Sequence, residues 1–330
     1  MPDPDRPLVE VRGLTKHFPV RRGLFGRVVG QVHAVDEASF TVPRRGTVAL
    51  VGESGCGKTT TGRTLLRLLS ATSGTVLFDG VDLFEEKPKR LRALRKRMQM
   101  IFQDPYASLN PRMSVDDTIE EGLRIHTRLS PPERRARVDE LLDLVELGAA
   151  ARGRYPHEFS GGQRQRIGIA RALATDPDFL VCDEPVSALD VSIQAQILNL
   201  LMDLQARLGI ALLFIAHDLA VVRHLADRVV VMYLGHVMED TPAQALFEEP
   251  LHPYTQALLA AVPEPRPGRR HRAPVKGEIP SPVHPPPGCR FHTRCPHVMD
   301  RCRRDPIPVY EPRPGRKVKC VLYREGSPDH

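Results

Sequence analysis

One eight-residue stretch constrains the fold more than any other part of this 330-residue chain. It has glycines at its first, fourth and sixth positions and ends in Lys-Thr; it reads Gly52, Glu53, Ser54, Gly55, Cys56, Gly57, Lys58, Thr59. An apolar run at 47–51 precedes it, and a helical pattern at 59–69 follows it. Glycines let a backbone wrap tightly, so that successive N–H groups and a helix N-terminus face one anion. The stretch therefore predicts a loop that binds nucleotide phosphates.

Within this loop, Lys58 is expected to reach the β- and γ-phosphates, and the hydroxyl of Thr59 is expected to bind Mg²⁺. We include Thr60 in the predicted site. Cys56 is interpreted as a small filler of the loop rather than a nucleophile.

A second candidate is the apolar run 179–182, which ends in two acids. Such a strand delivers side chains to the carboxyl edge of an open α/β sheet, where ligands bind. We expect Asp183 to hold Mg²⁺, directly or through water. Glu184 is expected to orient and polarise the attacking water.

Short β-branched runs alternate with helical patterns through most of the chain, which predicts an α/β fold with a largely parallel sheet. The expected strands are 9–11, 35–42, 47–51, 75–78, 99–102, 179–182, 211–215 and 228–233. The expected helices are 59–69, 138–147, 163–174, 193–208 and 219–225. The charged stretch 91–158 is poor in strands after residue 102, so we interpret about 91–165 as an inserted helical subdomain. The Pro, Gly and Arg content beyond Pro263 argues against regular secondary structure there.

Further residues make the chain similar to the nucleotide-binding subunits of ABC transporters. Phe159, Ser160, Gly161, Gly162 and Gln163, before a predicted helix, resemble the family signature, a second anion cradle. In this family it closes on the γ-phosphate of ATP held by a partner subunit. Gln103 resembles the glutamine that senses Mg²⁺ and the attacking water, and His217 resembles the switch histidine at the γ-phosphate.

Two weaker likenesses complete the set. The run Ser187, Ala188, Leu189, Asp190 resembles the loop that links the two sites across the dimer, and Phe18 could stack on adenine or simply pack. The resemblance covers about residues 8–250 and implies a P-loop NTPase fold of the ABC type. Every position expected for hydrolysis holds the expected residue type, so we predict a competent ATPase.

Two stretches narrow the resemblance to oligopeptide and dipeptide importers: 103–112, reading QDPYASLNPR, and 251–255, reading LHPYT. The group implies an extracellular binding protein, two membrane permease subunits and a second ATPase, often a different chain. It places the chain at the cytoplasmic face of the plasma membrane, with 104–114 meeting the permease. Peptide is the expected cargo; nickel, glutathione and other solutes remain alternatives.

Charge and proline divide the chain into an ATPase domain at 1–250 and an extension at 251–330. Residues 263–330 carry a net charge of +8 and residues 1–262 carry −1, which together give the net +7 of the chain; 18 of the 31 prolines lie from Pro242 onward. The longest apolar runs are far shorter than the roughly 18 residues that cross a bilayer. Residues 1–6 lack the layout of a signal peptide, which favours a cytoplasmic chain in which disulfides are rare.

The extension carries four cysteines, Cys289, Cys295, Cys302 and Cys320, whose spacing indicates a metal site. Paired Cys-x2-Cys knuckles, usual for structural zinc, are missing. A Cys-Pro step at 295–296 favours iron–sulfur ligation, and the peptide-importer resemblance implies a [4Fe-4S] cluster in some members. Nine Lys and Arg against three acids at 288–320 would stabilise an anionic cluster. Zinc and free thiols remain alternatives.

Two nucleic-acid functions compete with this interpretation. ABC-type ATPases of DNA maintenance share the phosphate loop and signature, but they usually insert a long module or duplicate the domain. Here Gly52 and Ser160 lie 108 positions apart, each motif occurs once, and the excess basic charge is confined to the extension. A nucleic-acid zinc module in the extension is disfavoured because few aromatics are available to stack bases. We therefore expect no nucleic-acid partner.

Overall fold

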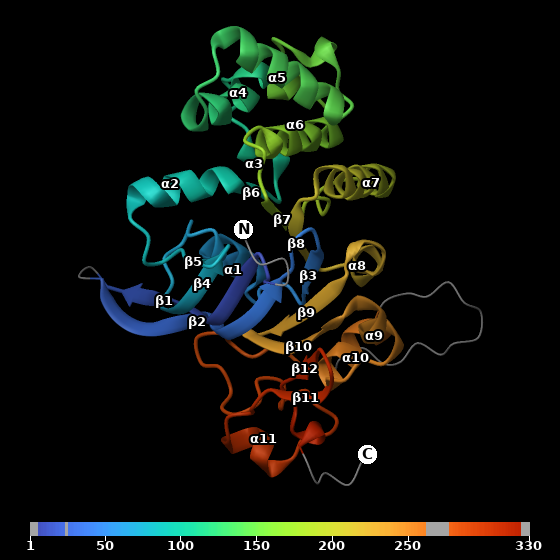
Figure 1. The fold of residues 1–330 in the computed structure, drawn as a ribbon. Helices are drawn as coiled ribbons and strands as arrows, with labels where there is room; N and C mark the ends of the chain where they lie inside the picture. Colours follow the sequence, from blue (N-terminus) through green and yellow to red (C-terminus); the bar gives the residue numbers. More distant parts are fainter. Residues whose placement is uncertain (1–5, 24–25, 262–276, 325–330) are drawn as a thin grey trace. The chain divides into compact units, whose positions relative to one another are not determined.

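The computed structural model describes residues 6–23, 26–261 and 277–324, which divide into two compact units (Figure 1). The first unit contains Met1–Leu8, Pro43–Gly46 and Glu85–Ile215; the second contains Val9–Val42, Thr47–Phe84 and Ala216–His330. Two predictions fall partly outside the described residues. One is that residues 1–6 lack the layout of a signal peptide, and the other is that residues 263–276 lack regular structure. Each unit joins segments that are far apart in the sequence.

The first unit is built on three parallel strands, β6 (Met98–Ile101), β7 (Phe179–Asp183) and β8 (Ala211–Ala216), with β7 in the middle. Every residue of β7 and β8 is buried. Continuous burial means that both faces of the sheet are covered, as expected when helical crossovers join parallel strands. The edge where β7 ends therefore carries the two predicted acids.

Between β6 and β7 the structure contains helices only. They are α3 (Pro105–Ser108), α4 (Val115–His126), α5 (Pro131–Leu144), the short 3-10 turns Ala149–Ala151 and Pro156–Glu158, and α6 (Gly161–Leu173). Helix α4 packs against α5 and α6, and it buries Ile119 and Leu123. The Ser114 hydroxyl caps α4 by accepting from the amide of Asp117 (3.1 Å). Side-chain capping thus places the start of α4 directly after residues 104–114.

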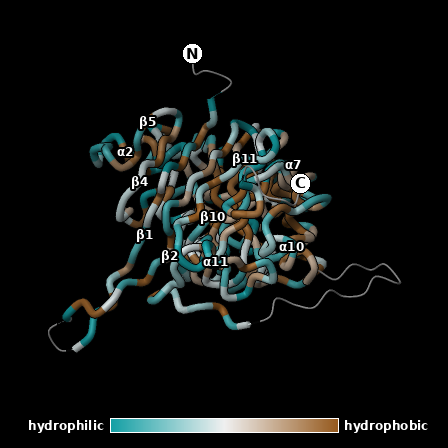
Figure 2. The backbone as a smooth tube through the Cα atoms, turned by 90° about the horizontal axis from the view of Figure 1, so that it is seen from below, coloured by the Kyte–Doolittle hydropathy of each residue, from teal (hydrophilic) through white to brown (hydrophobic). Residues whose placement is uncertain are grey.

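Two more helices flank these strands. Helix α2 (Pro88–Arg97) precedes β6, and α7 (Val191–Leu208) connects β7 to β8. Helix α2 is mostly hydrophilic in Figure 2, yet it buries Leu91 and Leu94. Sequence reasoning missed α2 and α4 as separate helices because their charged residues obscure the apolar spacing.

The second unit contains two sheets. One is antiparallel, in the order β2-β1-β4-β5, and its strands are β1 (Val9–Arg22), β2 (Arg27–Val42), β4 (Ser73–Phe78) and β5 (Val81–Asp82). In the other, β3 (Thr47–Val51) pairs in parallel with β9 (Arg228–Tyr233). Antiparallel pairing continues from β9 to β10 (His236–Pro242), β12 (Arg316–Val318) and β11 (Tyr310–Arg313). The helices of this unit are α1 (Lys58–Leu65), α8 (Leu219–Leu225), α9 (Ala243–Glu248), α10 (Pro253–Ala260) and α11 (Asp300–Arg304).

Two expectations are corrected here. The predicted strands 9–11, 35–42 and 75–78 belong to an antiparallel sheet, so the single largely parallel sheet was wrong for them. The prediction of no regular structure beyond Pro263 was also wrong, because α11, β11 and β12 form there. Strand β12 pairs with β10, so tertiary partners order a segment whose own sequence favours no structure.

None of the helices among the described residues has the length and apolar character needed to cross a membrane.

Candidate nucleotide site and cysteine cavity

The predicted phosphate loop lies between β3 and α1, as its sequence context requires. Gly52 and Gly57 have φ values of 152° and 107°, and both touch other backbone segments closely. A Cβ atom would lie 2.1 Å from the Met232 carbonyl oxygen at the first position and 2.0 Å from that of Ala34 at the second. These two glycines are needed because neighbouring backbone leaves no room for a side chain.

Lys58 begins helix α1 and is almost fully buried. Its ammonium group donates to the carbonyl oxygens of Gly52 (2.8 Å) and Glu53 (3.1 Å). The charge is therefore held across the loop at the helix N-terminus, the end of a helix that favours anions. Burial raises the pKa of the Cys56 thiol, which fits a space-filling thiol and not a nucleophile.

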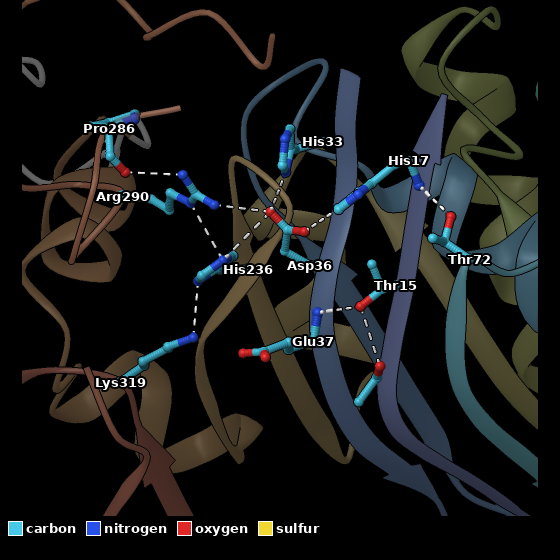
Figure 3. A network of polar contacts seen from close by, with 11 residues as sticks. Thr15, His17, His33, Asp36, Glu37, Thr72, His236, Pro286, Arg290 and Lys319 are labelled. Carbon is cyan, nitrogen blue, oxygen red and sulfur yellow. Dashed lines mark hydrogen bonds and ion pairs between the residues drawn. The ribbon is translucent and has the colours of Figure 1, made fainter. Parts of the chain in front are cut away.

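The predicted adenine contact, Phe18, lies on β1 opposite Val32 and is half-buried, with the ammonium of Lys16 4.7 Å from its ring centroid. Its neighbour His17 belongs to a polar network around Asp36 (Figure 3). The Asp36 carboxylate also contacts His33 (3.2 Å) and the guanidinium of Arg290 (3.0 Å). The extension thus reaches the strand next to Phe18.

The ligand atoms of His17, His33 and Asp36 lie within 4.8 Å of one another, the spacing of a metal site. Two cations argue against a metal ion there. Arg290 bonds the same carboxylate, and the ammonium of Lys319 lies 3.0 Å from Nδ1 of His236, whose Nε2 is 3.8 Å from Asp36. Burial raises the pKa of Asp36, but the His17 hydrogen bond and the nearby histidines outweigh it, so that pKa lies below its usual value. We interpret the cluster as an ion-pair network.

In the first unit, β7 brings Asp183 and Glu184 to its carboxyl end. Asp183 is fully buried, whereas Glu184 is partly exposed and has φ of 43°, an uncommon conformation for a non-glycine residue. The Gln103 amide donates to the Glu184 carboxylate (3.1 Å). Two residues that are 81 positions apart and were assigned to one site by sequence therefore lie in contact.

The predicted signature forms the N-terminus of α6. The Ser160 hydroxyl accepts from the Gln163 amide (3.3 Å), and the Gln163 side chain accepts from the Ser160 amide (3.0 Å), a reciprocal cap. Gly162 packs on Ile193 of α7, where a Cβ would lie 2.5 Å from its side chain. Ser160 remains exposed, and so does Asp190, which precedes α7.

Residues 104–114 are fixed to the same helix. The Arg164 guanidinium lies 3.8 Å from the ring centroid of Tyr106, and Arg171 donates to the Ser108 carbonyl oxygen (2.5 Å). Tyr106 is 62% exposed. This segment therefore presents an exposed aromatic ring while it is anchored to the helix that starts at the signature.

The predicted site residues are divided between the two units. Gln103, Asp183, Glu184, Ser160–Gln163 and Asp190 belong to the first; Phe18, the phosphate loop with Thr60, and His217 belong to the second. His217 follows β8 and is exposed, directly before Asp218, whose carboxylate caps α8.

The four cysteines of the extension line one cavity, together with His252, His292 and His297. Cys302 and Cys320 are buried, and Cys289 and Cys295 are partly exposed. Burial raises the pKa of Cys289 to about 11 and that of Cys320 to about 12. Among the described residues, three or more potential ligand atoms within 4.8 Å of one another occur at the Asp36 network and not among these sulfurs.

Four of the nine cations at 288–320 already have carboxylate partners, which corrects the expected excess of free positive charge. Arg290 pairs with Asp36 and Arg294 pairs with Glu53, while Arg313 and Arg316 both pair with Glu249. These pairs leave less free positive charge for an anionic cluster than the sequence suggested.

Sequence reasoning missed two contacts to the phosphate loop. The Glu53 carboxylate is bound by Arg294, and the Glu53 amide donates to the Tyr254 hydroxyl (2.9 Å). Nothing in the sequence links these positions, since they are separated by 241 and 201 residues.

Comparison with known proteins gives matches over both parts of the chain. Residues 35–187 match the ABC transporter family, and residues 238–302 match the C-terminal region of oligopeptide/dipeptide transporters. The probable peptide ABC transporter ATP-binding protein y4tS of Sinorhizobium fredii is 54% identical, over 98% of this chain and 92% of its own. The oligopeptide transport ATP-binding protein AppF of Bacillus subtilis is 52% identical, over 96% and 97%.

Solved structures give the same fold. The dimeric, post-hydrolysis state of an ATP-binding cassette bound to ADP and Pi aligns with a TM-score of 0.63 and 27% identity, over 71% of this chain and 98% of that one. The cbiO1 protein of Clostridium perfringens, part of an ABC transporter complex, aligns with a TM-score of 0.63 and 28% identity, over 74% and 92%.

Proposed function

Since this chain belongs to the ATP-binding proteins of ABC transporters, in the oligopeptide/dipeptide group, we propose that it is the ATP-hydrolysing subunit that drives peptide import through a membrane permease. One observation carries the proposal: the chain matches peptide-transport relatives over nearly its whole length, including the C-terminal region. Import of nickel, glutathione or another solute is the alternative, because substrate selection lies on other chains.

For hydrolysis, the phosphate loop would bind the triphosphate of ATP with Lys58 at the β- and γ-phosphates. Thr59, Gln103 and Asp183 would hold Mg²⁺, which supplies positive charge that offsets the phosphate oxygens. Glu184 would accept a proton from the attacking water, and its contact with Gln103 supports a shared role at that water. His217 would contact the γ-phosphate, and Phe18 would stack on adenine.

A second ATPase subunit, a paralogue by family resemblance, would complete the site. Ser160, at the exposed N-terminus of α6, supports this role because its position leaves a helix end available to an anion on another chain. The mutual capping of Ser160 and Gln163 keeps that end ordered. Gly161, which is partly exposed, and the exposed Asp190 would take part in the same contact, with Gly162 buried against Ile193.

We propose a domain division of 1–250 for the ATPase, with a helical subdomain at about 91–165, and 251–330 for the importer extension. Within the subdomain, 104–114 would meet the permease at the cytoplasmic face of the plasma membrane. The exposed Tyr106, held by Arg164 of α6, supports such a contact.

A membrane preparation tests the class and the partners. We expect the tagged chain, extracted in mild detergent, to co-purify with two permease subunits and a second ATPase, and the complex to hydrolyse ATP faster when its extracellular binding protein carries a peptide. A soluble homodimer that binds duplex DNA would instead support an ATPase of DNA maintenance.

For the extension we propose that Cys289, Cys295, Cys302 and Cys320 hold a [4Fe-4S] cluster, with zinc as the alternative. Four thiolates on one zinc ion lie about 3.8 Å apart, given a Zn–S distance of about 2.3 Å. The sulfurs that line this cavity are spaced more widely than a single ion requires, because no three of them lie within 4.8 Å of one another. A bound cluster would supply a metal–thiolate staple with one-electron redox chemistry.

Metal analysis of anaerobically purified chain distinguishes the two metals. We expect about four iron and four sulfide per chain with brown visible absorbance. Both should be lost in Cys302→Ser and retained in Cys182→Ala, which removes a cysteine on β7 outside the cavity. Stoichiometric zinc without iron in the wild type would contradict the cluster.

A further inference from the structure

The short segment between Cys289 and Cys295 contacts the phosphate loop through Arg294. Its guanidinium binds the Glu53 carboxylate at two points, Nη1 to Oε2 (2.7 Å) and Nη2 to Oε1 (3.0 Å). Nη1 also donates to the Tyr233 hydroxyl (3.3 Å). The Arg294 side chain is only 5% exposed. A two-point, buried pair fixes orientation as well as distance.

The backbone amide, the carbonyl oxygen and the side chain of Glu53 each make a hydrogen bond. Its amide donates to the Tyr254 hydroxyl, its side chain binds Arg294, and its carbonyl oxygen accepts from Lys58 (3.1 Å). A displacement of Glu53 therefore moves a carbonyl that positions the lysine expected at the phosphates. Arg294 acts on that lysine through one intervening residue.

The turn that carries Arg294 is fixed by the packing of Phe291. Phe291, three residues earlier, is fully buried, with its ring centroid 5.3 Å from those of Tyr233 and Tyr254. The Arg294 amide donates to the Phe291 carbonyl oxygen (3.0 Å), so the two residues form one turn between the two cysteines. This packing leaves the turn little freedom to move without also moving Cys295.

The same segment reaches β2, the strand that pairs with the strand carrying Phe18. Arg290, next to Cys289, donates to Asp36 (3.0 Å). The same carboxylate accepts from His17, the neighbour of Phe18, so the segment contacts the region of the predicted adenine stack as well (Figure 3). Arg290 and Arg294 together connect the cysteine cavity to both parts of the nucleotide site in this unit.

From this geometry we infer that Arg294 is a positioning residue for the phosphate loop and couples MgATP affinity to the state of the cysteine cavity. The inference rests on the proposed function only in requiring that the loop binds ATP. It holds for bound metal or free thiols alike, because the connection runs through protein groups. Coupling is reciprocal by linkage, so MgATP must also shift the equilibrium between states of the cysteine cavity, and we expect that shift to change how readily its thiols react.

Nucleotide binding to Arg294 variants tests the first half. We expect Arg294→Ala to weaken binding of a fluorescent ATP analogue with Mg²⁺ about tenfold, and Arg294→Lys, which keeps the charge but loses the two-point contact, to weaken it less. Arg303→Ala, which removes an exposed arginine of α11, should bind like the wild type. Unchanged affinity in a folded Arg294→Ala chain would overturn the inference; failure of the wild type to bind ATP would instead refute the proposed function.

A double-mutant cycle tests the route. In a Glu53→Gln background the Arg294→Ala change should cost at least threefold less affinity than it does in the wild type, because its partner has lost its charge. An equal loss in both backgrounds would show that Arg294 does not act through Glu53.

The reciprocal effect gives a second readout, the reactivity of the cysteines. We expect saturating MgATP to slow alkylation of Cys289 and Cys295 by iodoacetamide several-fold in a Glu184→Gln chain, in which turnover is blocked, measured by peptide mass spectrometry. The protection should disappear when Arg294→Ala is added, at an MgATP concentration that saturates both chains. Equal alkylation rates with and without MgATP in the parent chain would overturn the coupling.

Discussion

Glu184→Gln should lower kcat for ATP hydrolysis by about 100- to 10,000-fold in the assembled transporter, the range that a general base contributes. The amide keeps the size of the side chain but cannot take a proton from water. MgATP binding should persist, because the phosphate loop and its lysine are unchanged. Steady-state phosphate release and equilibrium nucleotide binding, measured on the same preparation, separate the two effects.

Glu140→Gln is a suitable control, because Glu140 is exposed on α5 and pairs with Arg137 at the surface. It should leave kcat unchanged. A kcat for Glu184→Gln within twofold of the wild type would show that another group serves as the base. An equal loss of MgATP affinity would mean that Glu184 acts in binding.

Phe291→Ala should destabilise the chain by about 3–5 kcal/mol, the usual cost of emptying a fully buried aromatic site. The Phe291 ring contacts Tyr233 of β9 and Tyr254 of α10, so its loss leaves a cavity where the extension packs on β9 within the second unit. Urea unfolding followed by circular dichroism measures the change in the free energy of unfolding.

Val309→Ala provides the comparison for this second prediction. Val309 lies in the same extension but is 61% exposed, so its truncation should cost less than about 0.5 kcal/mol. If Phe291→Ala proved as mild as this control, the extension would not share a core with the strands beside the phosphate loop.

Local patterns in the sequence were sufficient for several elements. The strands β3 and β9 and helix α8 have the predicted bounds, because each is short and mainly apolar. The phosphate loop lies between a strand and a helix as predicted, since its glycines are required by local geometry. The contact of Gln103 with Glu184 agrees with their shared assignment.

Other features depended on partners distant in the chain. Whether a β-branched run joins a parallel or an antiparallel sheet is decided by the strand it meets, and Val9 pairs with both Val42 and Phe78. The extension gave no local signal for β12, which forms against β10. The net charge of the extension likewise did not predict how its arginines are used.

By itself, the sequence determined the nucleotide chemistry of this protein, because phosphate binding needs specific residues at fixed short spacing. It also determined that four cysteines gather in one extension. Only the tertiary structure decided where that extension binds, since the pairs of Arg294 with Glu53 and Arg290 with Asp36 join residues more than 200 positions apart. Burial and charge complementarity select such pairs in the folded chain, and no local pattern records them.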